Sequence, residues 1–476
     1  MKKNYKKTIL ILTTVAVTFA SCKKFLDVQP EDKVIETQLY KSPAGIKQVL
    51  NGLYINIASD GLYGNRLSLS TIEVLGQRYN VPSTHNLNKI GTYAYNDAPT
   101  TTHLEGIWTG AYSNILNVNA FLSNLETYKG VLDAKTEAIY KGEALAMRAF
   151  LHFDLFRLFG PRYSTADSTA KSIPYYESPK STINPLLPGN EFIVKVINDL
   201  RAAETLLAED AIITTGVNTA GATDQADFLR NNRNQRFNYY AVKGLLARVC
   251  LYRGDKVSAL KYAKEVIAIS DKFKWTTVTN ALNEKQNPDR VFSTEMIFGI
   301  MNSQLYNLQT SLFDPSLTDA VILAPLTARL NTVFENNEND YRFNLNWQVP
   351  PTGIKTYRTF YKYADIVDKA KTFRFTIPLL KISEMYFIAA ETEPVAADGV
   401  NLLNIVRANR GLTALATTVN INTELQKEYQ KEFFGEGQLF YYYKRRNITS
   451  IPNGSSTANI TVNYAIPMPV SETQYR

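Results

Sequence analysis

A helical periodicity in residues 143–160 constrains the fold of this chain more than any other feature of its sequence. Large apolar side chains recur there at three- and four-residue steps, at Met147, Phe150, Leu151, Leu155, Leu158 and Phe159. This spacing gathers them on one face of an α-helix, so the segment predicts an amphipathic helix that packs against other helices. Gly160 and Pro161 follow, and both residues disfavour continuation of a helix.

Similar patterns predict helices along the rest of the chain and therefore a mainly α fold. The expected helical segments are residues 42–58, 106–128, 134–160, 191–208, 238–270, 378–410 and 423–446. Gly254 breaks the fifth of these into two helices, and Gly435 and Gly437 interrupt the last one.

The helix pair in residues 238–270 has a more specific spacing. Ala247 and Ala259 lie 12 residues apart, across a two-residue turn at Gly254 and Asp255. Small residues at such positions let two antiparallel helices pack closely, as in a tetratricopeptide (TPR) hairpin. A generic αα-hairpin is the alternative. Because no period of about 34 residues runs through the chain, any such repeats must be separated by long inserts.

Two long inserts interrupt the helical pattern, at residues 63–102 and 273–363. They mix turns with short strand-like runs, such as residues 296–300 and 321–324. Long excursions from a compact frame are usually functional or disordered. We therefore expect a helical frame with a large surface of loops and short β-hairpins mounted on it.

The N-terminus predicts export and a lipid anchor. Four lysines within the first seven residues precede an apolar run over residues 8–20, which is typical of a signal peptide and short for a membrane span. The small residues before Cys22 resemble a bacterial lipobox. Residues 1–21 are therefore predicted to be a lipoprotein signal peptide, and Cys22 is predicted to be lipidated and to anchor a single mature domain, residues 22–476. An ordinary cleaved signal with an incidental cysteine is the alternative.

Residues that commonly hold metals or cofactors are scarce. The chain has 3 His and 2 Cys, which argues against a zinc cage, an iron–sulfur cluster or a haem site. Without the four lysines of the predicted signal peptide, 48 basic and 44 acidic residues leave a net charge of +4, so no nucleic-acid partner is predicted. Cys250 lies in an apolar run and is expected to be a small core residue.

The sequence also lacks the motifs GxxxxGK[ST], GxGxxG, HExxH and GxSxG. His152 lies within the helix of residues 143–160 and is expected to be a packed side chain rather than a base. We therefore predict no catalytic residue, no cofactor and no metal site. A pair of carboxylates for glycoside hydrolysis stays open, because the separation of such a pair is set in space rather than in sequence.

Aromatic and amide side chains cluster in the two inserts. They are Gln77, Arg78, Tyr79, Asn80, Tyr93, Tyr95, Asn96, Tyr306, Asn307, Gln309, Trp347 and Tyr357. An aromatic ring can stack on the C–H face of a sugar, while amides and guanidinium groups hydrogen-bond its hydroxyls. These groups suit a peptide equally well. The alternative is that the rings pin the loops onto the frame.

Several short segments also occur in a characteristic order. They are Cys22-Lys-Lys-Phe-Leu-Asp-Val-Gln-Pro30, Trp108-x-x-x-Tyr112, Glu143-Ala-x-x-x-Arg148, Phe153-Asp-Leu-x-Arg-Leu-Phe-Gly160, Ala241-x-Lys-Gly-Leu-Leu-Ala-Arg248, Thr294-Glu-Met-Ile-Phe298, Pro378-Leu-Leu-x-Ile-Ser-Glu384, Leu402-Leu-Asn-x-Val-Arg407 and Tyr464-Ala-Ile-Pro467. As an ordered set they resemble the RagB/SusD family of surface lipoproteins, the ligand-capturing partners of TonB-dependent outer-membrane transporters.

The resemblance implies four TPR-like helix pairs that form a scaffold, with irregular inserts carrying the ligand face. It implies a non-enzymatic lipoprotein of the outer membrane, displayed at the cell surface. Such a protein holds an oligosaccharide, or in some members a peptide, over a SusC-like TonB-dependent transporter. The positions that fall in the family's ligand-binding regions are Arg78, Tyr79, Tyr95, Asn96 and Tyr306.

Two other classes of protein are compatible with parts of the pattern. A TPR lipoprotein could scaffold envelope proteins without a small ligand, although a scaffold needs mainly a concave helical face and not long aromatic inserts. A secreted glycosidase would need two carboxylates about 5–10 Å apart in a pocket.

Overall fold

The computed structural model describes residues 37–164, 166–180, 182–218 and 229–476. The chain divides into two compact units, residues 1–49 and residues 50–476. The described part of the first unit contains the start of helix α3 (Pro43–Ile57), where the amide of Gly45 donates a hydrogen bond to Ser42 Oγ over 3.1 Å. The predicted signal peptide and Cys22 lie outside the described residues.

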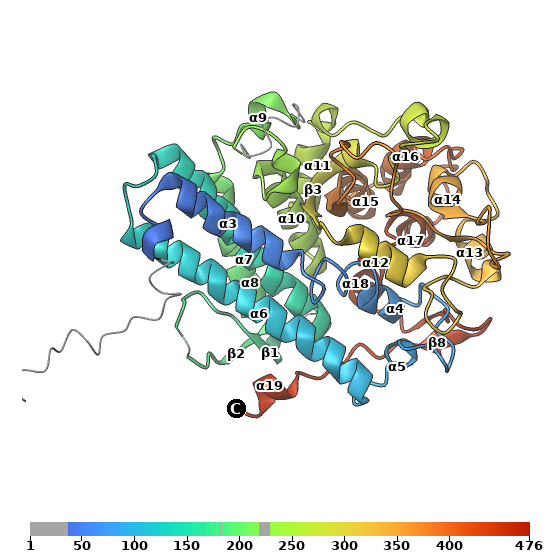
Figure 1. Cartoon of the computed structure of the whole chain (residues 1–476), viewed down its shortest axis with the longest axis horizontal. Helices are drawn as coiled ribbons and strands as arrows, with labels where there is room; N and C mark the ends of the chain where they lie inside the picture. Colours follow the sequence, from blue (N-terminus) through green and yellow to red (C-terminus); the bar gives the residue numbers. More distant parts are fainter. Residues whose placement is uncertain (1–36, 165, 181, 219–228) are drawn as a thin grey trace, which may run out of the picture. The chain divides into compact units, whose positions relative to one another are not determined.

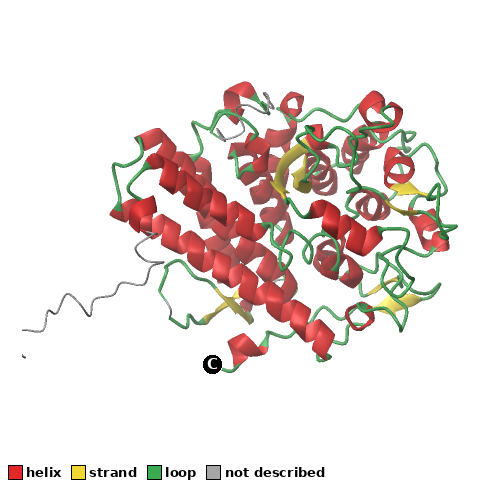
Figure 2. Cartoon of the chain, in the orientation of Figure 1, coloured by secondary structure: helices red, strands yellow, loops and turns green. Residues whose placement is uncertain are grey.

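Helices make up most of the regular structure of the second unit (Figures 1 and 2). They are α4 (Thr71–Leu75), α5 (Asn88–Gly91), α6 (Ala98–Thr127), α7 (Ala134–Phe159), α8 (Gly189–Leu206), α9 (Ile212–Thr215), α10 (Tyr239–Tyr252), α11 (Lys256–Ile267), α12 (Leu305–Phe313), α13 (Thr327–Val333), α14 (Tyr341–Asn346), α15 (Ile382–Thr392), α16 (Ala396–Ala408), α17 (Ile421–Glu432), α18 (Leu439–Arg446) and α19 (Val470–Thr473). The mainly α fold expected from the sequence is confirmed.

Strands are short and pair two by two, all of them antiparallel. The pairs are β1 (Lys171–Pro174) with β2 (Leu186–Pro188), β3 (Met296–Met301) with β6 (Thr376–Lys381), β4 (Trp347–Gln348) with β5 (Thr359–Phe360), and β7 (Ser450–Pro452) with β8 (Asn459–Thr461). The longest pair, β3 with β6, joins the second insert to the segment that leads into α15.

The long helices pack against their neighbours in the chain. α6 contacts α7, α7 contacts α8, α10 contacts α11, and α15 contacts α16. Figure 1 shows α6, α7 and α8 running alongside one another, with α15, α16 and α17 gathered on the opposite side of α10 and α11. Contacts between sequential helices are what a stack of helix pairs requires.

Helix α7 is more deeply buried than its apolar stripe predicts. Every residue from 146 to 159 is buried, including the charged residues of that stretch. Arg148 forms an ion pair with Asp199 at 2.6 Å, and Arg157 forms one with Asp154 at 2.5 Å. Because these ion pairs satisfy its charged side chains, the helix can be covered on all sides by other elements.

The predicted helix pair is present as α10 and α11, which contact each other. Ala247 and Ala259 are both fully buried, which is the close packing that the spacing predicts. Asp255 caps α11, accepting a hydrogen bond from the amide of Ser258 at 3.0 Å. Cys250 is a buried free cysteine, as expected, and burial raises the pKa of its thiol to about 11.

Two segments differ from the prediction. Residues 378–381 were expected to be helical but belong to strand β6, all of whose residues are buried. A short, fully buried apolar run has no periodicity that separates strand from helix, and pairing with β3 decides the outcome. Residues 321–324 were expected to be strand-like but form a loop. Helix α6 also begins earlier than predicted, with Pro99 in its first turn.

A buried lysine in α18 makes the stability of this fold depend on pH. Lys444 Nζ donates hydrogen bonds to the carbonyl oxygens of Leu158 at 2.9 Å and Gly160 at 2.7 Å, at the end of α7. Burial lowers its pKa to about 7. Since the unfolded lysine keeps its proton up to a pKa near 10.5, the unfolded state binds more protons between these two values, and stability rises with pH in that window.

We therefore expect the free energy of unfolding of the native chain to rise relative to that of Lys444→Met between pH 7 and pH 9. The slope of this difference should be at most about 1.4 kcal/mol per pH unit. Urea unfolding at several pH values measures it, with Lys261→Met on the exposed face of α11 as a control. Parallel pH profiles for the native chain and Lys444→Met would contradict the assignment.

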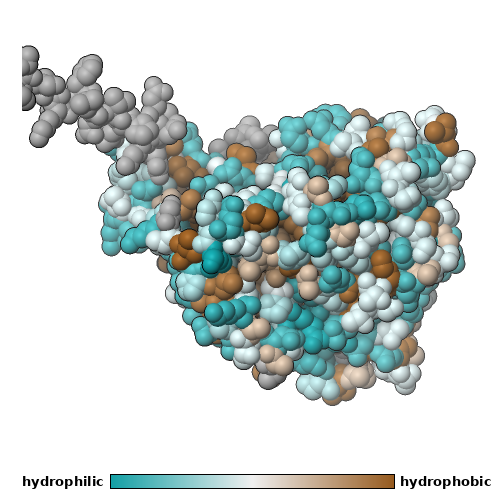
Figure 3. Space-filling model, turned by 90° about the horizontal axis from the view of Figure 1, so that it is seen from below, coloured by the Kyte–Doolittle hydropathy of each residue, from teal (hydrophilic) through white to brown (hydrophobic). Residues whose placement is uncertain are grey.

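The surface of the second unit is mixed in character. On the face shown in Figure 3, hydrophilic residues are interspersed with small hydrophobic groups. Among the described helices, none is both long and apolar enough to cross a membrane.

Candidate ligand-binding site

The two inserts meet at a small hollow. The backbone amide of Asn80, in the first insert, donates a hydrogen bond to the carbonyl oxygen of Ala324, in the second, over 2.9 Å. The hollow beside this contact has a volume of about 120 Å³. Its lining residues are Asn80, Asp319, Ile322, Ala324, Pro325, Leu326, Thr327 and Tyr357. Since ligand pockets commonly measure about 300–1,000 Å³, this volume accommodates part of a larger molecule.

Asp319 is the centre of the polar groups at this hollow. Its carboxylate accepts a hydrogen bond from the hydroxyl of Tyr357 at 2.9 Å and pairs with the ammonium group of Lys355. These two hydrogen bonds lower the pKa of Asp319, so the carboxylate is ionised at neutral pH. The Asp319 side chain is 73% exposed, and it can accept further hydrogen bonds from a ligand.

Tyr357 supplies an aromatic surface next to that carboxylate. The ring is half-buried, and Lys355 Nζ lies 5.5 Å from its centroid. Both residues lie in the segment between β4 and β5, which also carries the exposed apolar side chains of Val349 and Ile354. A ring face, a carboxylate and an amide side chain within one hollow can bind the apolar and hydroxyl faces of a sugar together.

Arg78 and Tyr79, two of the residues predicted to bind ligand, are buried. Arg78 donates a hydrogen bond to the carbonyl oxygen of Tyr429 at 3.3 Å, and its guanidinium group lies 3.9 Å from the ring centroid of Phe434. Tyr79 is 1% exposed and packs against Phe313, with 5.9 Å between the ring centroids. In this conformation both side chains hold the first insert to the rest of the fold, which is the alternative that the sequence left open.

Tyr95, Asn96 and Tyr306 also lie outside the hollow. Tyr95 is buried and its hydroxyl donates a hydrogen bond to the carbonyl oxygen of Asn463. Asn96 is exposed. Tyr306 is half-buried, its hydroxyl bonds to the carbonyl oxygen of Arg374, and it lines a separate small hollow. Ligand contact by Asn96 and Tyr306 stays a prediction.

The structure therefore brings together a different set from the one predicted. Asn80 and Tyr357 were among the insert side chains noted in the sequence, but Asp319 and Lys355 were not. A single aspartate or lysine in a loop carries no spacing signal. A search for charged residues near aromatic residues of the same insert could have found Lys355, two positions before Tyr357.

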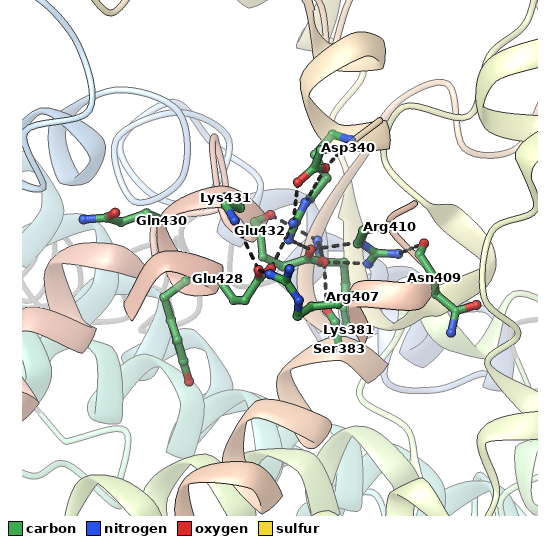
Figure 4. Close-up of polar contacts among 12 residues, drawn as sticks. Asp340, Lys381, Ser383, Arg407, Asn409, Arg410, Glu428, Gln430, Lys431 and Glu432 are labelled. Carbon is green, nitrogen blue, oxygen red and sulfur yellow. Dashed lines mark hydrogen bonds and ion pairs between the residues drawn. The ribbon is translucent and has the colours of Figure 1, made fainter. Parts of the chain in front are cut away.

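A buried network of charges holds the second insert in place. Figure 4 shows Arg407 and Arg410 meeting the acidic residues Glu428 and Glu432 of α17 in one cluster. Glu432 accepts hydrogen bonds from Arg410 Nη2 at 2.7 Å and from Arg342 Nη1 at 3.1 Å. Arg410 also pairs with Glu295 of the insert at 2.6 Å. The network thus fastens residues around 295 and 342 to α17.

The basic groups of this network keep its carboxylates ionised. Burial alone would raise the pKa of Glu432, but Arg410 and then Lys381 hold it well below its ordinary value. Burial would also raise the pKa of Glu428, but its basic neighbours, with Arg342 as the strongest, outweigh that effect and lower the pKa to about 2. These charges are paired with one another, so the network is a structural element and not a ligand site.

Acidic and histidine side chains are few at the hollow, and in the described ranges they are not gathered into a metal site. Among those that line the hollow, Asp319 is the only one with a carboxylate. No group of three or more His, Cys, Asp or Glu side chains in the described ranges is placed to hold a metal ion. His152 is buried, with Nδ1 3.0 Å from the Arg148 carbonyl oxygen, and Nε2 accepts a hydrogen bond from the amide of Tyr176. It is a packed side chain, as predicted.

Comparisons with known proteins point to one family. Residues 24–226 match the model of a SusD-like family described as starch-binding and associating with the outer membrane. A SusD-like protein of Bacteroides ovatus is 28% identical over 301 residues, which cover 59% of this chain and 48% of that protein. The chain therefore matches about half the length of this curated relative.

Solved structures show the same fold. A SusD superfamily protein from Bacteroides thetaiotaomicron aligns over 91% of this chain and 98% of its own, with a TM-score of 0.70 and 19% identity. A laminarin-binding SusD-like protein aligns over 91% of this chain and 97% of its own, with a TM-score of 0.66 and 16% identity. At these identities the similarity establishes the fold.

Proposed function

We propose that this chain, a member of the SusD-like family, is a non-catalytic protein that binds glycan fragments. The observation that carries the proposal is the hollow between the inserts, where the ring of Tyr357 lies beside the ionised carboxylate of Asp319 and the side chain of Asn80. The laminarin-binding structural neighbour and the description of the family as starch-binding support a glycan as the ligand.

The contacts available at the hollow suit a ligand that is held and then released. Each hydrogen bond or stacked ring contributes about 1 kcal/mol net, so a few of them give dissociation constants between micromolar and millimolar. Holding and releasing such a ligand breaks no covalent bond and requires no general base, so these contacts agree with a binding role.

We further propose that the chain is anchored in the outer membrane through Cys22, is displayed at the cell surface and passes its ligand to a SusC-like TonB-dependent transporter. The apolar run before Cys22 and the family's description as associating with the outer membrane support the anchor. Detergent partitioning of cells that produce the native chain or Cys22→Ala tests it: the variant should move to the aqueous phase. Co-purification with a transporter of the same cells tests the partner.

Loss of the Tyr357 ring should weaken glycan binding. We expect Tyr357→Ala to raise the dissociation constant for laminarin or soluble starch fragments about fivefold or more, because one stacked ring and the orientation of Asp319 are both lost. Affinity gel electrophoresis and calorimetry measure the change. Tyr475→Ala, which removes an exposed tyrosine near the C-terminus, is the matched control and should bind as the native chain does.

Two outcomes would contradict the proposal. One is unchanged retention of a folded Tyr357→Ala protein on every glycan that retains the native chain. The other is a native chain that binds peptides but no glycan, or that turns a glycan over. Asn96→Ala and Tyr306→Ala, measured in the same way, test the two remaining candidates from the sequence.

A further inference from the structure

A second, larger cleft lies elsewhere in the second unit. Its volume is about 340 Å³, within the usual range for a ligand site. The walls come from the end of α9, from the residues before α10, from the residues that follow α11 and from the segment that leads into β6. It shares no lining residue with the hollow at Asp319.

Two buried asparagines face this cleft with unused hydrogen-bonding groups. Asn232 is 6% exposed and Asn234 is 5% exposed, and both line the cleft. Neither side-chain amide hydrogen-bonds to any part of the chain that the structure describes. Each amide therefore has a carbonyl oxygen and an NH2 group with which a ligand in the cleft can form hydrogen bonds.

The backbone that carries these amides is held firmly. Arg233, between them in the sequence, is fully buried and forms ion pairs with Asp210 at 2.7 Å and with Glu143 at 2.6 Å. Asn232 adopts a left-handed conformation with φ of 50°, which asparagine tolerates better than most residues. The backbone that carries the two asparagines is thus fixed, so a ligand would not have to order it on binding.

The cleft is also positively charged. Lys272 and Lys274 line it, and no ion pair of either residue is found within the described part of the chain. Among the described lining residues, Asp271 is the only acidic one, so the lining carries a net charge of +1. Unpaired ammonium groups beside neutral amides favour a ligand that combines an anionic group with hydroxyls.

Phe373 adds an apolar wall. The side chain is half-buried and lines the cleft, and no other ring of the described residues packs on it. Its ring can stack on the C–H face of a sugar while the amides of Asn232 and Asn234 hydrogen-bond the sugar hydroxyls. Phe373 also lines the small hollow of Tyr306, so a chain of sugar units could extend from one to the other.

We propose that this cleft is a second binding site, for an oligosaccharide that carries carboxylate groups. Lys272 and Lys274 pair with the carboxylates, Asn232 and Asn234 bind hydroxyls, and Phe373 stacks on a sugar ring. The site is independent of the hollow at Asp319, so the two can fail or succeed separately.

The probe is an oligomer of galacturonic acid, and the measurement is calorimetry at low ionic strength with the native chain. We expect the double variant Lys272→Gln/Lys274→Gln to weaken binding at least tenfold, and Phe373→Ala to weaken it about fivefold. The matched control is Lys256→Gln/Lys261→Gln, which removes two exposed lysines of α11 outside the cleft. Binding should also weaken as salt is added, because added ions screen the charges.

Further arms separate the alternatives. Tyr357→Ala should bind the acidic oligomer as the native chain does, so failure of the hollow at Asp319 leaves this result intact. The uncharged malto-oligomer should bind the Lys272→Gln/Lys274→Gln variant and the native chain equally. No binding of the acidic oligomer, equal loss in the control variant, or binding of a sulfated oligomer alone would overturn the assignment.

Discussion

Glu432→Gln is expected to lower the free energy of unfolding by about 3–5 kcal/mol, the usual cost of removing one partner from a buried group of charges. The Glu432 carboxylate is fully buried and is contacted by Arg410, Arg342 and, at 3.0 Å, by Lys381 Nζ. Glutamine has nearly the same shape but no charge. The substitution therefore removes one buried counter-ion that Arg410, Arg342 and Lys381 share, and it loosens the attachment of the second insert.

The measurement is urea unfolding at pH 7 followed by circular dichroism. The matched control is Glu338→Gln, which removes the same charge from a pair between Glu338 and Arg358 at 2.8 Å, where the glutamate side chain is 59% exposed. A surface pair contributes at most about 1 kcal/mol, so the control should change little. Similar losses in the two variants would show that the buried network does not fasten the insert.

The helical frame was predictable because a helix that buries one face carries apolar residues at every third or fourth position of its sequence. Along α7 the apolar residues repeat at helical spacing, and its end at Gly160 agrees with the prediction. The break between α17 and α18 was predictable for a local reason. Gly435 and Gly437 adopt φ of 70° and 71°, a conformation that side chains disfavour.

Strand β6 was not predictable in the same way. Its residues are buried on both faces, so they show neither the alternation of a half-buried strand nor the stripe of a helix. Whether this segment forms a strand or a helix depends on its pairing with β3, which lies far upstream in the sequence. Local preference thus gives way to a pairing that the sequence alone does not display.

The candidate site was predictable by region but not by residue. Both inserts do meet at one hollow, yet Tyr79 is buried and Tyr357 is not. Both are tyrosines in loops, and what separates them is the presence of a distant partner. Tyr79 packs against Phe313 of α12, whereas Tyr357 contacts residues at the surface. A ring in a loop can therefore bind a ligand or pin the loop, and packing decides between them.

Trp347→Ala is expected to lower the free energy of unfolding by about 3–5 kcal/mol and also to weaken glycan binding. The Trp347 side chain is 1% exposed and packs against Phe360 and Phe434, with ring centroids 4.6 Å and 5.0 Å away. It begins β4, and its pairing with Phe360 of β5 fixes both ends of the segment that carries Lys355 and Tyr357. A cavity at this position removes that support.

Phe192→Ala separates the loss of stability from the loss of binding. Phe192 is fully buried in α8, and its ring centroid lies 5.1 Å from that of Phe156. Phe192→Ala should therefore lower the free energy of unfolding by a similar amount while the β4–β5 segment keeps its support. Both variants are compared by calorimetry with laminarin fragments at a temperature where circular dichroism shows both to be folded. Binding should fall in Trp347→Ala alone. If the two variants bind equally well, the hollow at Asp319 does not depend on the anchoring of this segment.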